Sequence, residues 1–300
     1  DAPKPRSRAW RGGAVVPEAV LSATSLVSTW LSPLSEASPR LFEAVCEAWP
    51  SRDWAEARLE ALLPTVRASF SSSNVFPRDG DRPCPTAHVA MRDFLSRVRG
   101  GRGASGKHVY CHGVELPEAA APDCPLPPLL RSERVARRSL WISGAEAVTP
   151  LHYDLQHVLL CQLQGWKRVW LLAPQHHDVL RPAGLSFPSM GPQERIARTQ
   201  RKALPPGVAN QGLSVELRAG DALLIPAGWW HEVESFAPAD GLGCCISLGH
   251  NWPQTGDAIQ LFAAYAASTT YPILTQGEVL AQYYGADKVQ GLPNKDDTVF

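Results

Sequence analysis

Two short segments carry side chains of the kinds that bind metals. His152 and Asp154 lie two residues apart in "TPLHYD", and His231 follows much later in "AGWWHEVES". Because side chains two apart in a β-strand point to the same face, His152 and Asp154 should project together while Tyr153 points away. Two imidazoles and one carboxylate on one side of a metal form the facial triad typical of non-haem Fe(II) oxygenases, which leaves coordination positions open.

The alternative explanation of the His152–Asp154 pair is a core histidine bonded to a carboxylate, because His-x-Asp is common by chance. The neighbouring residues favour the metal site. Lys167 lies beside the apolar run "VWLL", so its ammonium must reach water or meet an anion. Thr149 and Tyr110 lie in neighbouring strand-like segments, and an edge-strand threonine and a core tyrosine are their ordinary explanations.

The elements that would position these residues are mostly strands. From Lys107 onward, short apolar segments alternate with turns, and 148–164 followed by 167–174 is typical of a hairpin that turns at Gly165. Upstream, 51–63 and 86–99 show helical spacing with Ser51 and Thr86 as caps, and 71–85 is predicted to be loop. Further helical stretches are expected within 14–38 and 256–285, and 40–48 fits either a helix or a strand. Helices gathered around a run of strands indicate a single domain built on a barrel or sandwich.

The composition sets broad limits. The 300 residues are 44% hydrophobic, enough for a full core, and Lys+Arg equals Asp+Glu at 29 each. No net field therefore draws the chain to nucleic acid or membrane, and the apolar runs are too short for a spanning helix. The 7 cysteines show no regular spacing, which favours reduced thiols and an intracellular, cytoplasmic or nuclear, location. Residues 1–13 are basic and proline-rich and are predicted to be disordered, leaving 14–300 as the folded domain.

The segments "TPLHYD", "GWKRVWLLAP" and "AGDALLIPAGWWHEVES" resemble the JmjC-type, cupin-fold oxygenases that depend on Fe(II) and 2-oxoglutarate. Among these the chain looks most similar to the small hydroxylase branch, which includes the asparaginyl hydroxylase of hypoxia-inducible factor. The resemblance covers about residues 39–255 and favours a strand at 40–48. It implies a mainly β fold, a double-stranded β-helix (jelly-roll) barrel over about 107–255, with N-terminal and C-terminal helices packed on it.

The resemblance also implies roles for individual residues. His152, Asp154 and His231 would bind Fe(II). Thr149 and Lys167 would bind the distal carboxylate of 2-oxoglutarate, assisted by Tyr110.

Two departures from the family pattern affect the cosubstrate pocket. Relatives carry an asparagine six residues after the first ligand histidine, where this chain has Val158. The strand after the second ligand histidine departs as well and is "SLGHNW" here. Asn251 is therefore expected to supply the polar side chain of that strand, unless His250 points inward instead.

The activity that the resemblance implies is hydroxylation of an amino-acid side chain in a protein or peptide, with release of succinate and CO2. Demethylation of N-methyl lysine or arginine, RNA hydroxylation, a non-catalytic metal-binding cupin and a zinc hydrolase are the alternatives. The candidates for substrate contact are Gln156, Trp230, Arg195 and Arg198, the last two in the insert 181–212, whose basic residues would otherwise form a solvated helix face. The helices of 256–285 are expected either to pair two subunits as a homodimer or to cover the barrel.

Overall fold

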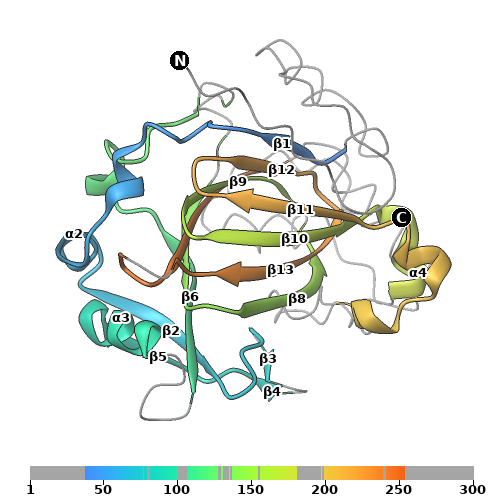
Figure 1. Ribbon diagram of the computed structural model, residues 1–300, viewed down its shortest axis with the longest axis horizontal. Helices are drawn as coiled ribbons and strands as arrows, with labels where there is room; N and C mark the ends of the chain where they lie inside the picture. Colours follow the sequence, from blue (N-terminus) through green and yellow to red (C-terminus); the bar gives the residue numbers. More distant parts are fainter. Residues whose placement is uncertain are drawn as a thin grey trace, which may run out of the picture.

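Two antiparallel β-sheets face each other in the computed structural model of the protein (Figure 1). The structure describes residues 38–76, 78–79, 82–100, 107–127, 130, 135, 137–154, 156–180, 197, 199–238 and 241–253. The large sheet has, in spatial order, β1 (Arg40–Phe42), β12 (Ala222–Ile225), β9 (Gln156–Gln164), β14 (Cys245–Pro253), β7 (Arg137–Ser143), β6 (His108–Glu115), β2 (Thr65–Ser71) and β5 (Thr86–Ala90). The small sheet has β11 (Leu213–Arg218), β10 (Trp166–Leu172), β13 (Trp230–Phe236) and β8 (Ala147–Tyr153).

The chain passes repeatedly between the two sheets. From β8 it enters the large sheet at β9, returns to the small sheet for β10 and β11, and then visits β12, β13 and β14 in alternation. This winding confirms the mainly β, jelly-roll fold with few helices. The sandwich interior is filled by aliphatic side chains from both sheets: Val158, Leu160, Val169, Leu171, Val215, Leu217, Leu223, Ile225 and Val233.

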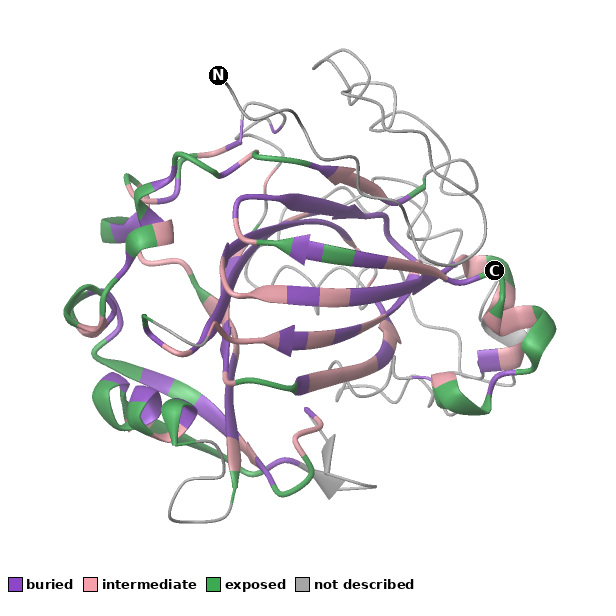
Figure 2. Cartoon of the chain, viewed as in Figure 1, coloured by how far each residue is buried: buried purple, intermediate pink, exposed green. Residues whose placement is uncertain are grey.

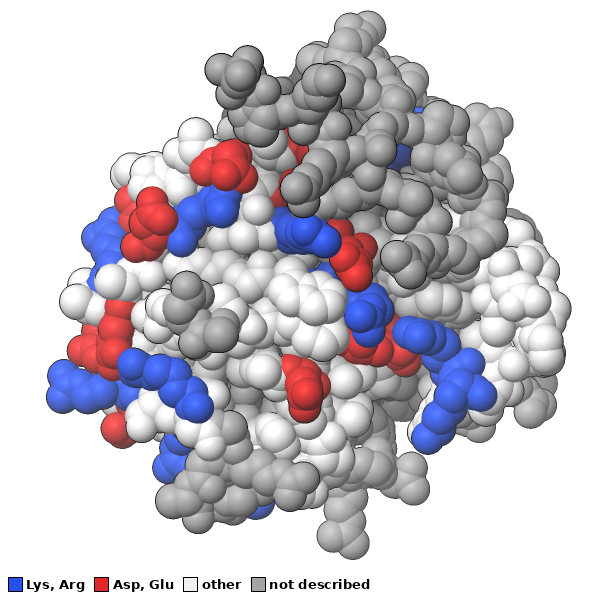
Figure 3. Space-filling model, viewed as in Figure 1, with Lys and Arg blue, Asp and Glu red and all other residues white. Residues whose placement is uncertain are grey.

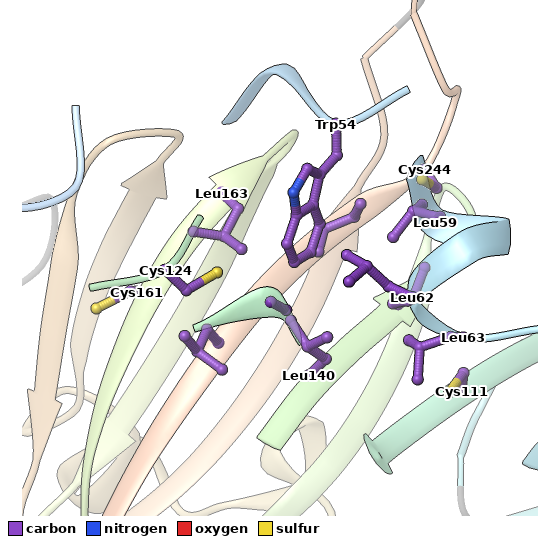
Figure 4. Close-up of a cluster of buried hydrophobic side chains, with 14 of the residues drawn as sticks. Trp54, Leu59, Leu62, Leu63, Cys111, Cys124, Leu140, Cys161, Leu163 and Cys244 are labelled. Atoms are coloured by element: carbon purple, nitrogen blue, oxygen red, sulfur yellow. The ribbon is translucent and has the colours of Figure 1, made fainter. Parts of the chain in front are cut away.

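Short helices cover the outer face of the large sheet. η1 (Pro50–Asp53), α2 (Glu56–Leu62) and α3 (Met91–Arg99) pack there, and α3 buries Met91, Phe94, Leu95 and Val98, which recur at helical spacing. Figure 4 shows Leu59 and Leu62 of α2 on the side of Leu140, with Trp54 between them and Leu163 of the sheet. This second core lies on the outer side of the large sheet and is separate from the aliphatic cluster between the two sheets.

The outer face of the small sheet carries a different cover. Buried and half-buried residues alternate along much of β10 and β13, as Figure 2 shows. The remaining elements are β3 (Arg78–Asp79), β4 (Arg82–Pro83), η2 (Glu118–Ala120), η4 (Pro174–His176), α4 (His177–Leu180), η6 (Arg201–Ala203) and α5 (Pro206–Ala209). Leu180 and Leu204 from this group pack on Trp170 and Trp230 of the small sheet.

No helix in the described part of the chain is long and apolar enough to span a membrane.

Several predicted elements are wrong in detail. α2 begins at Glu56, and its N-cap residue, Ala55, offers no side-chain bond, whereas Ser51 lies buried in η1. Thr86 does not cap a helix, because 86–90 form β5 at the edge of the large sheet and α3 begins only at Met91. Pairing with β2 makes residues 86–90 a strand, because tertiary pairing of this kind overrides the helical spacing of the sequence. The expected loop at 71–85 contains the β3–β4 pair.

The predictions for the two ends of the chain have other outcomes. Arg40–Phe42 forms a strand, as the resemblance implied, and the chain turns after it. The helical stretches expected at 14–38 and 256–285 fall on residues outside the described ranges, apart from residue 38. Their proposed roles in covering the barrel or pairing subunits stay predictions.

The predicted hairpin around Gly165 is also wrong. β9 pairs with β12 and β14 in the large sheet, whereas β10 pairs with β11 and β13 in the small sheet. Gly165 joins them at a corner with a φ of 70°, in the left-handed region that favours glycine. A hairpin and a corner look alike in the local sequence, since both need a turn between two apolar runs.

Replacing Gly165 by alanine should strongly destabilise this corner. A Cβ there would stand 2.4 Å from the Phe236 carbonyl oxygen, a backbone atom that cannot move away cheaply. With the cost of the positive φ added, we expect a loss of about 3 kcal/mol or more in the free energy of unfolding, measured by denaturant titration. Gly241→Ala is the matched control: its φ is 68° but a Cβ would meet nothing within 4 Å, so it should cost only about 1 kcal/mol. Equal losses in the two variants would contradict the clash.

Candidate metal centre

Three predicted ligand residues come together at one end of the barrel. His152 in β8 lies directly opposite His231 in β13, and their ring centroids are 4.1 Å apart. Asp154 follows the end of β8, with its Oδ2 3.7 Å from Nε2 of His231. One ligand atom from each of the three residues lies within 4.8 Å of the others, a separation that allows all three to hold one metal ion.

Backbone carbonyl groups fix the orientation of both imidazoles. Nδ1 of His152 lies 2.8 Å from the Pro150 carbonyl oxygen, and Nδ1 of His231 lies 3.0 Å from that of Trp229. Because a carbonyl only accepts hydrogen bonds, each Nδ1 must donate, and this tautomer carries its lone pair on Nε2. Both rings are therefore prepared to offer Nε2 to a metal.

An extra residue in β8 brings Thr149 into the same interior. Thr149 lies opposite Val233 and His152 lies opposite His231, so β8 uses three residues where β13 uses two. A bulge of this kind changes the phase of side-chain alternation. As a result, Thr149 and His152 both face the barrel, although residues three apart in a regular strand would face opposite ways.

Lys167 lies buried inside the barrel. It is only 3% exposed, and no acidic side chain among the described residues forms an ion pair with it. Burial lowers the pKa of its ammonium, an effect that the nearby Cys245 partly offsets. A positive charge held this way favours an anionic ligand strongly.

Tyr110 and Thr149 form the hydroxyl pair expected beside Lys167. Tyr110 is 4% exposed, and its hydroxyl shares a side-chain hydrogen bond with Thr149. Burial raises the pKa of Tyr110, so the phenol stays protonated and can act as a donor. The structure thus brings together both hydroxyls that the resemblance assigned to the cosubstrate.

The two departures from the family pattern have separate outcomes. Val158 faces the barrel interior opposite Asn251, whose Oδ1 lies 3.5 Å from the place of a Cβ on Gly249. Asn251 is therefore on the interior side, where its expected polar role stays a prediction. His250 does not point inward, because successive residues of a strand alternate between faces. It is fully buried on the other face of β14, where its ring centroid lies 6.2 Å from that of Trp49.

The four candidates for substrate contact have different outcomes. Trp230 is wrong, because it is fully buried on the outer side of the small sheet and packs edge-on against Tyr153 at 4.8 Å. It precedes the ligand His231 and must face the opposite way. Gln156 is half-buried at the start of β9, just after Asp154, and stays a prediction. Arg195 and Arg198 lie outside the described residues.

The basic residues that follow them along the insert are partly engaged elsewhere. Arg201 forms an ion pair of 2.9 Å with Glu232 on the outer face of the small sheet, and Arg168 pairs with Glu234 at 3.1 Å. Figure 3 shows basic and acidic side chains lying beside one another on this face. Arg201 is thus held by carboxylates of its own chain.

The sequence analysis missed a group of small polar residues inside the barrel. Ser143, Gln162, Ser235, Cys245 and Ser247 are all buried, and all come from strands that border the interior. Single serines and cysteines in strands carry no local signal of a site, so only the sheet register could have revealed them.

A family profile described as a cupin-like domain matches residues 32–258. The chain belongs to the JmjC-type, cupin-like family. Its relatives include "HSPB1-associated protein 1" of Rattus norvegicus, 32% identical over 68% of this chain and 47% of that protein. "Jumonji C domain-containing protein 5" of Drosophila melanogaster is 36% identical over 33% of this chain and 25% of its own length. "Lysine-specific demethylase JMJ31" of Arabidopsis thaliana is 30% identical over 38% of this chain and 21% of that protein.

The chain spans half or less of the length of these relatives. The family and its demethylase-named members support an enzyme of the oxygenase type in general terms.

Proposed function

We propose that the protein is an Fe(II)- and 2-oxoglutarate-dependent oxygenase that hydroxylates a side chain of a protein substrate. One observation carries the proposal: a His–Asp–His cluster and a buried ammonium without an ion-pair partner among the described residues come from the same barrel. The cluster suits a metal ion, and the ammonium suits the carboxylate of an organic acid. Few other activities require both together.

The donor sets fit these two groups. Two imidazoles and a carboxylate are the ligands preferred in facial triads, and their Nδ1–carbonyl hydrogen bonds orient them in advance. A dicarboxylate needs a fixed cation and hydroxyl donors, which Lys167, Tyr110 and Thr149 provide. When bound, Fe(II) and 2-oxoglutarate supply the oxidising chemistry, and the protein supplies the orientation and a dry interior.

A non-catalytic cupin is less well supported. Burying a lysine without an ion pair lowers stability, because the charged form loses its hydration. A protein that only held a metal would gain nothing from Lys167 at 3% exposure. A zinc hydrolase would likewise have no use for the anion pocket.

The substrate class rests on the relatives. Proteins named as lysine-specific demethylases and a protein named as associated with HSPB1 both suggest proteinaceous substrates or partners. We favour hydroxylation of a carbon that leaves a stable alcohol, and demethylation and RNA hydroxylation are the competing outcomes. An intracellular location and the absence of a membrane partner are parts of the same proposal.

Turnover and peptide mass spectrometry together test the proposal. Purified protein with Fe(II), 2-oxoglutarate and O2 should form succinate, and formation should increase with a peptide library that contains the substrate. A product heavier by one oxygen atom supports hydroxylation, whereas a product lighter by one methyl group supports demethylation. Absence of succinate with metal-loaded protein and every peptide and RNA pool would contradict the oxygenase assignment.

A further inference from the structure

Four strands of the large sheet place a row of polar side chains at the Lys167 end of the barrel. Tyr110 in β6 lies opposite Ser143 in β7, and Ser143 lies opposite Cys245 in β14. Side chains directly opposite each other share one face of the sheet and stand about 5 Å apart. Because Tyr110 contacts Thr149 of the small sheet, Ser143 and Cys245 face the interior too. We call Tyr110, Ser143, Gln162, Cys245 and Ser247 the end layer.

Gln162 and Ser247 complete the end layer. Ser247 lies opposite Trp141 and opposite Gln162, and the Gln162 Nε2 donates a hydrogen bond of 3.2 Å to the Cys245 Sγ. The Cys245 thiol in turn donates to the Trp166 carbonyl oxygen at 3.6 Å. Trp166 precedes Lys167, so this bond ties the end layer to the strand that carries the ammonium.

Several polar atoms of this layer lack a partner among the described residues. They are the Oγ atoms of Ser143 and Ser247 and the Oε1 atom of Gln162, in side chains that are 1% exposed or less. A buried hydroxyl without a hydrogen bond is unfavourable, and native proteins seldom tolerate one without a ligand or water to satisfy it. Here such atoms lie on the interior face of the large sheet, in the layer that Cys245 ties to the strand of Lys167.

Lys167, Tyr110 and Thr149 alone would not satisfy a carboxylate fully. Tyr110 and Thr149 share a hydrogen bond, so one of their two hydroxyl protons is used between them. A carboxylate accepts about four hydrogen bonds. The three N–H bonds of Lys167 diverge from one nitrogen and cannot all point at one carboxylate, so acceptor positions remain that serine hydroxyls of the end layer are suited to fill.

We propose that Ser143 and Ser247 bind the distal carboxylate of the dicarboxylate cosubstrate. They would act as positioning residues that determine which length of organic acid the pocket accepts and how tightly that acid binds. The inference rests on the proposed function and deepens it. Gln162 supports the arrangement by holding Cys245 in place through its Nε2. The pocket would then select organic acids that carry a second carboxylate.

Calorimetric titration of the Mn(II)-loaded protein tests this directly with two probes. 2-Oxoglutarate carries the distal carboxylate, whereas oxalate can chelate the metal but has no distal group. Ser143→Ala and Ser247→Ala should each weaken 2-oxoglutarate binding about tenfold, the effect of one hydrogen bond to a charged group. Oxalate binding should not change. Ser51→Ala, a buried serine of η1 outside the barrel, should change neither.

Thermal unfolding of the ligand-free variants separates binding from a structural role. Removing an unpartnered hydroxyl should leave the Tm unchanged or raise it, whereas a hydroxyl with a structural bond would lower the Tm when removed. Unchanged 2-oxoglutarate affinity in both variants, or equal weakening of oxalate, would overturn the inference and leave the proposed function intact. Failure of both probes to bind the wild-type protein would overturn the proposed function and this inference together.

Discussion

Asp154→Ala should reduce the affinity for Fe(II) or Mn(II) by at least about a hundredfold, because it removes the only anionic ligand of the cluster. His152 and His231 would remain opposite each other with their Nδ1 hydrogen bonds intact. Two neutral imidazoles cannot balance the charge of a divalent ion, so the remaining site should bind weakly. Titration with Mn(II) followed by electron paramagnetic resonance measures the loss.

An exposed aspartate serves as the control for this change. Asp53 lies on the surface in η1, and Asp53→Ala should leave the metal affinity unchanged. Both variants should keep the circular dichroism of the wild-type protein. Metal affinity that survives in Asp154→Ala would show that the three residues do not bind the ion together.

Lys167→Met should weaken cosubstrate binding but stabilise the ligand-free protein. It should weaken 2-oxoglutarate binding by about a hundredfold, because the charged hydrogen-bond donor is lost, while Mn(II) binding stays close to that of the wild type. It should also raise the Tm of the ligand-free protein, since methionine fills the same space without a buried charge. Lys202→Met, at an exposed position in η6, should do neither. Equal losses of metal and cosubstrate affinity would contradict the role of Lys167.

The pH dependence of stability offers a second measurement on Lys167. Burial lowers its pKa in the folded protein below the value of 10.5 that an exposed lysine shows. Between the lowered pKa and 10.5 the unfolded chain therefore binds more protons, and stability should rise with pH across that window. Denaturant titrations across that range should show the rise in wild-type protein and a smaller slope in Lys167→Met. Identical slopes would mean that Lys167 does not titrate abnormally.

The sequence was sufficient to predict the jelly-roll fold and the three residues that the structure brings together as a candidate metal site. Strand alternation placed His152 and Asp154 together, and the family motifs linked them to His231. The corner at Gly165 could not be predicted, because membership of a sheet depends on distant strands such as β12 and β14. Trp230 is adjacent to His231 in the sequence, which suggested a place near the site. Successive residues of a strand face opposite ways, so the two side chains lie on different faces of β13.

Ser143 shows a different limit of sequence reasoning. A serine after "LWI" carries no sign that it will lie between Tyr110 and Cys245. Such sites arise from register across several strands, which local patterns do not contain. Thr149 was recognised only through the motif, since the bulge that turns it inward has no local signature.

The position of β8 at the end of the small sheet has a consequence for the apoprotein. Within its own sheet, β8 pairs only with β13, and the candidate ligands His152 and His231 lie opposite each other on these two strands. Backbone hydrogen bonds of Val148 with Asn74 and Phe76, and of Leu151 with Ala197, hold the outer edge of β8. An ion held by His152 and His231 would add a further tie between β8 and β13. Metal binding at this pair would then raise the local stability of the two strands as well as prepare the site.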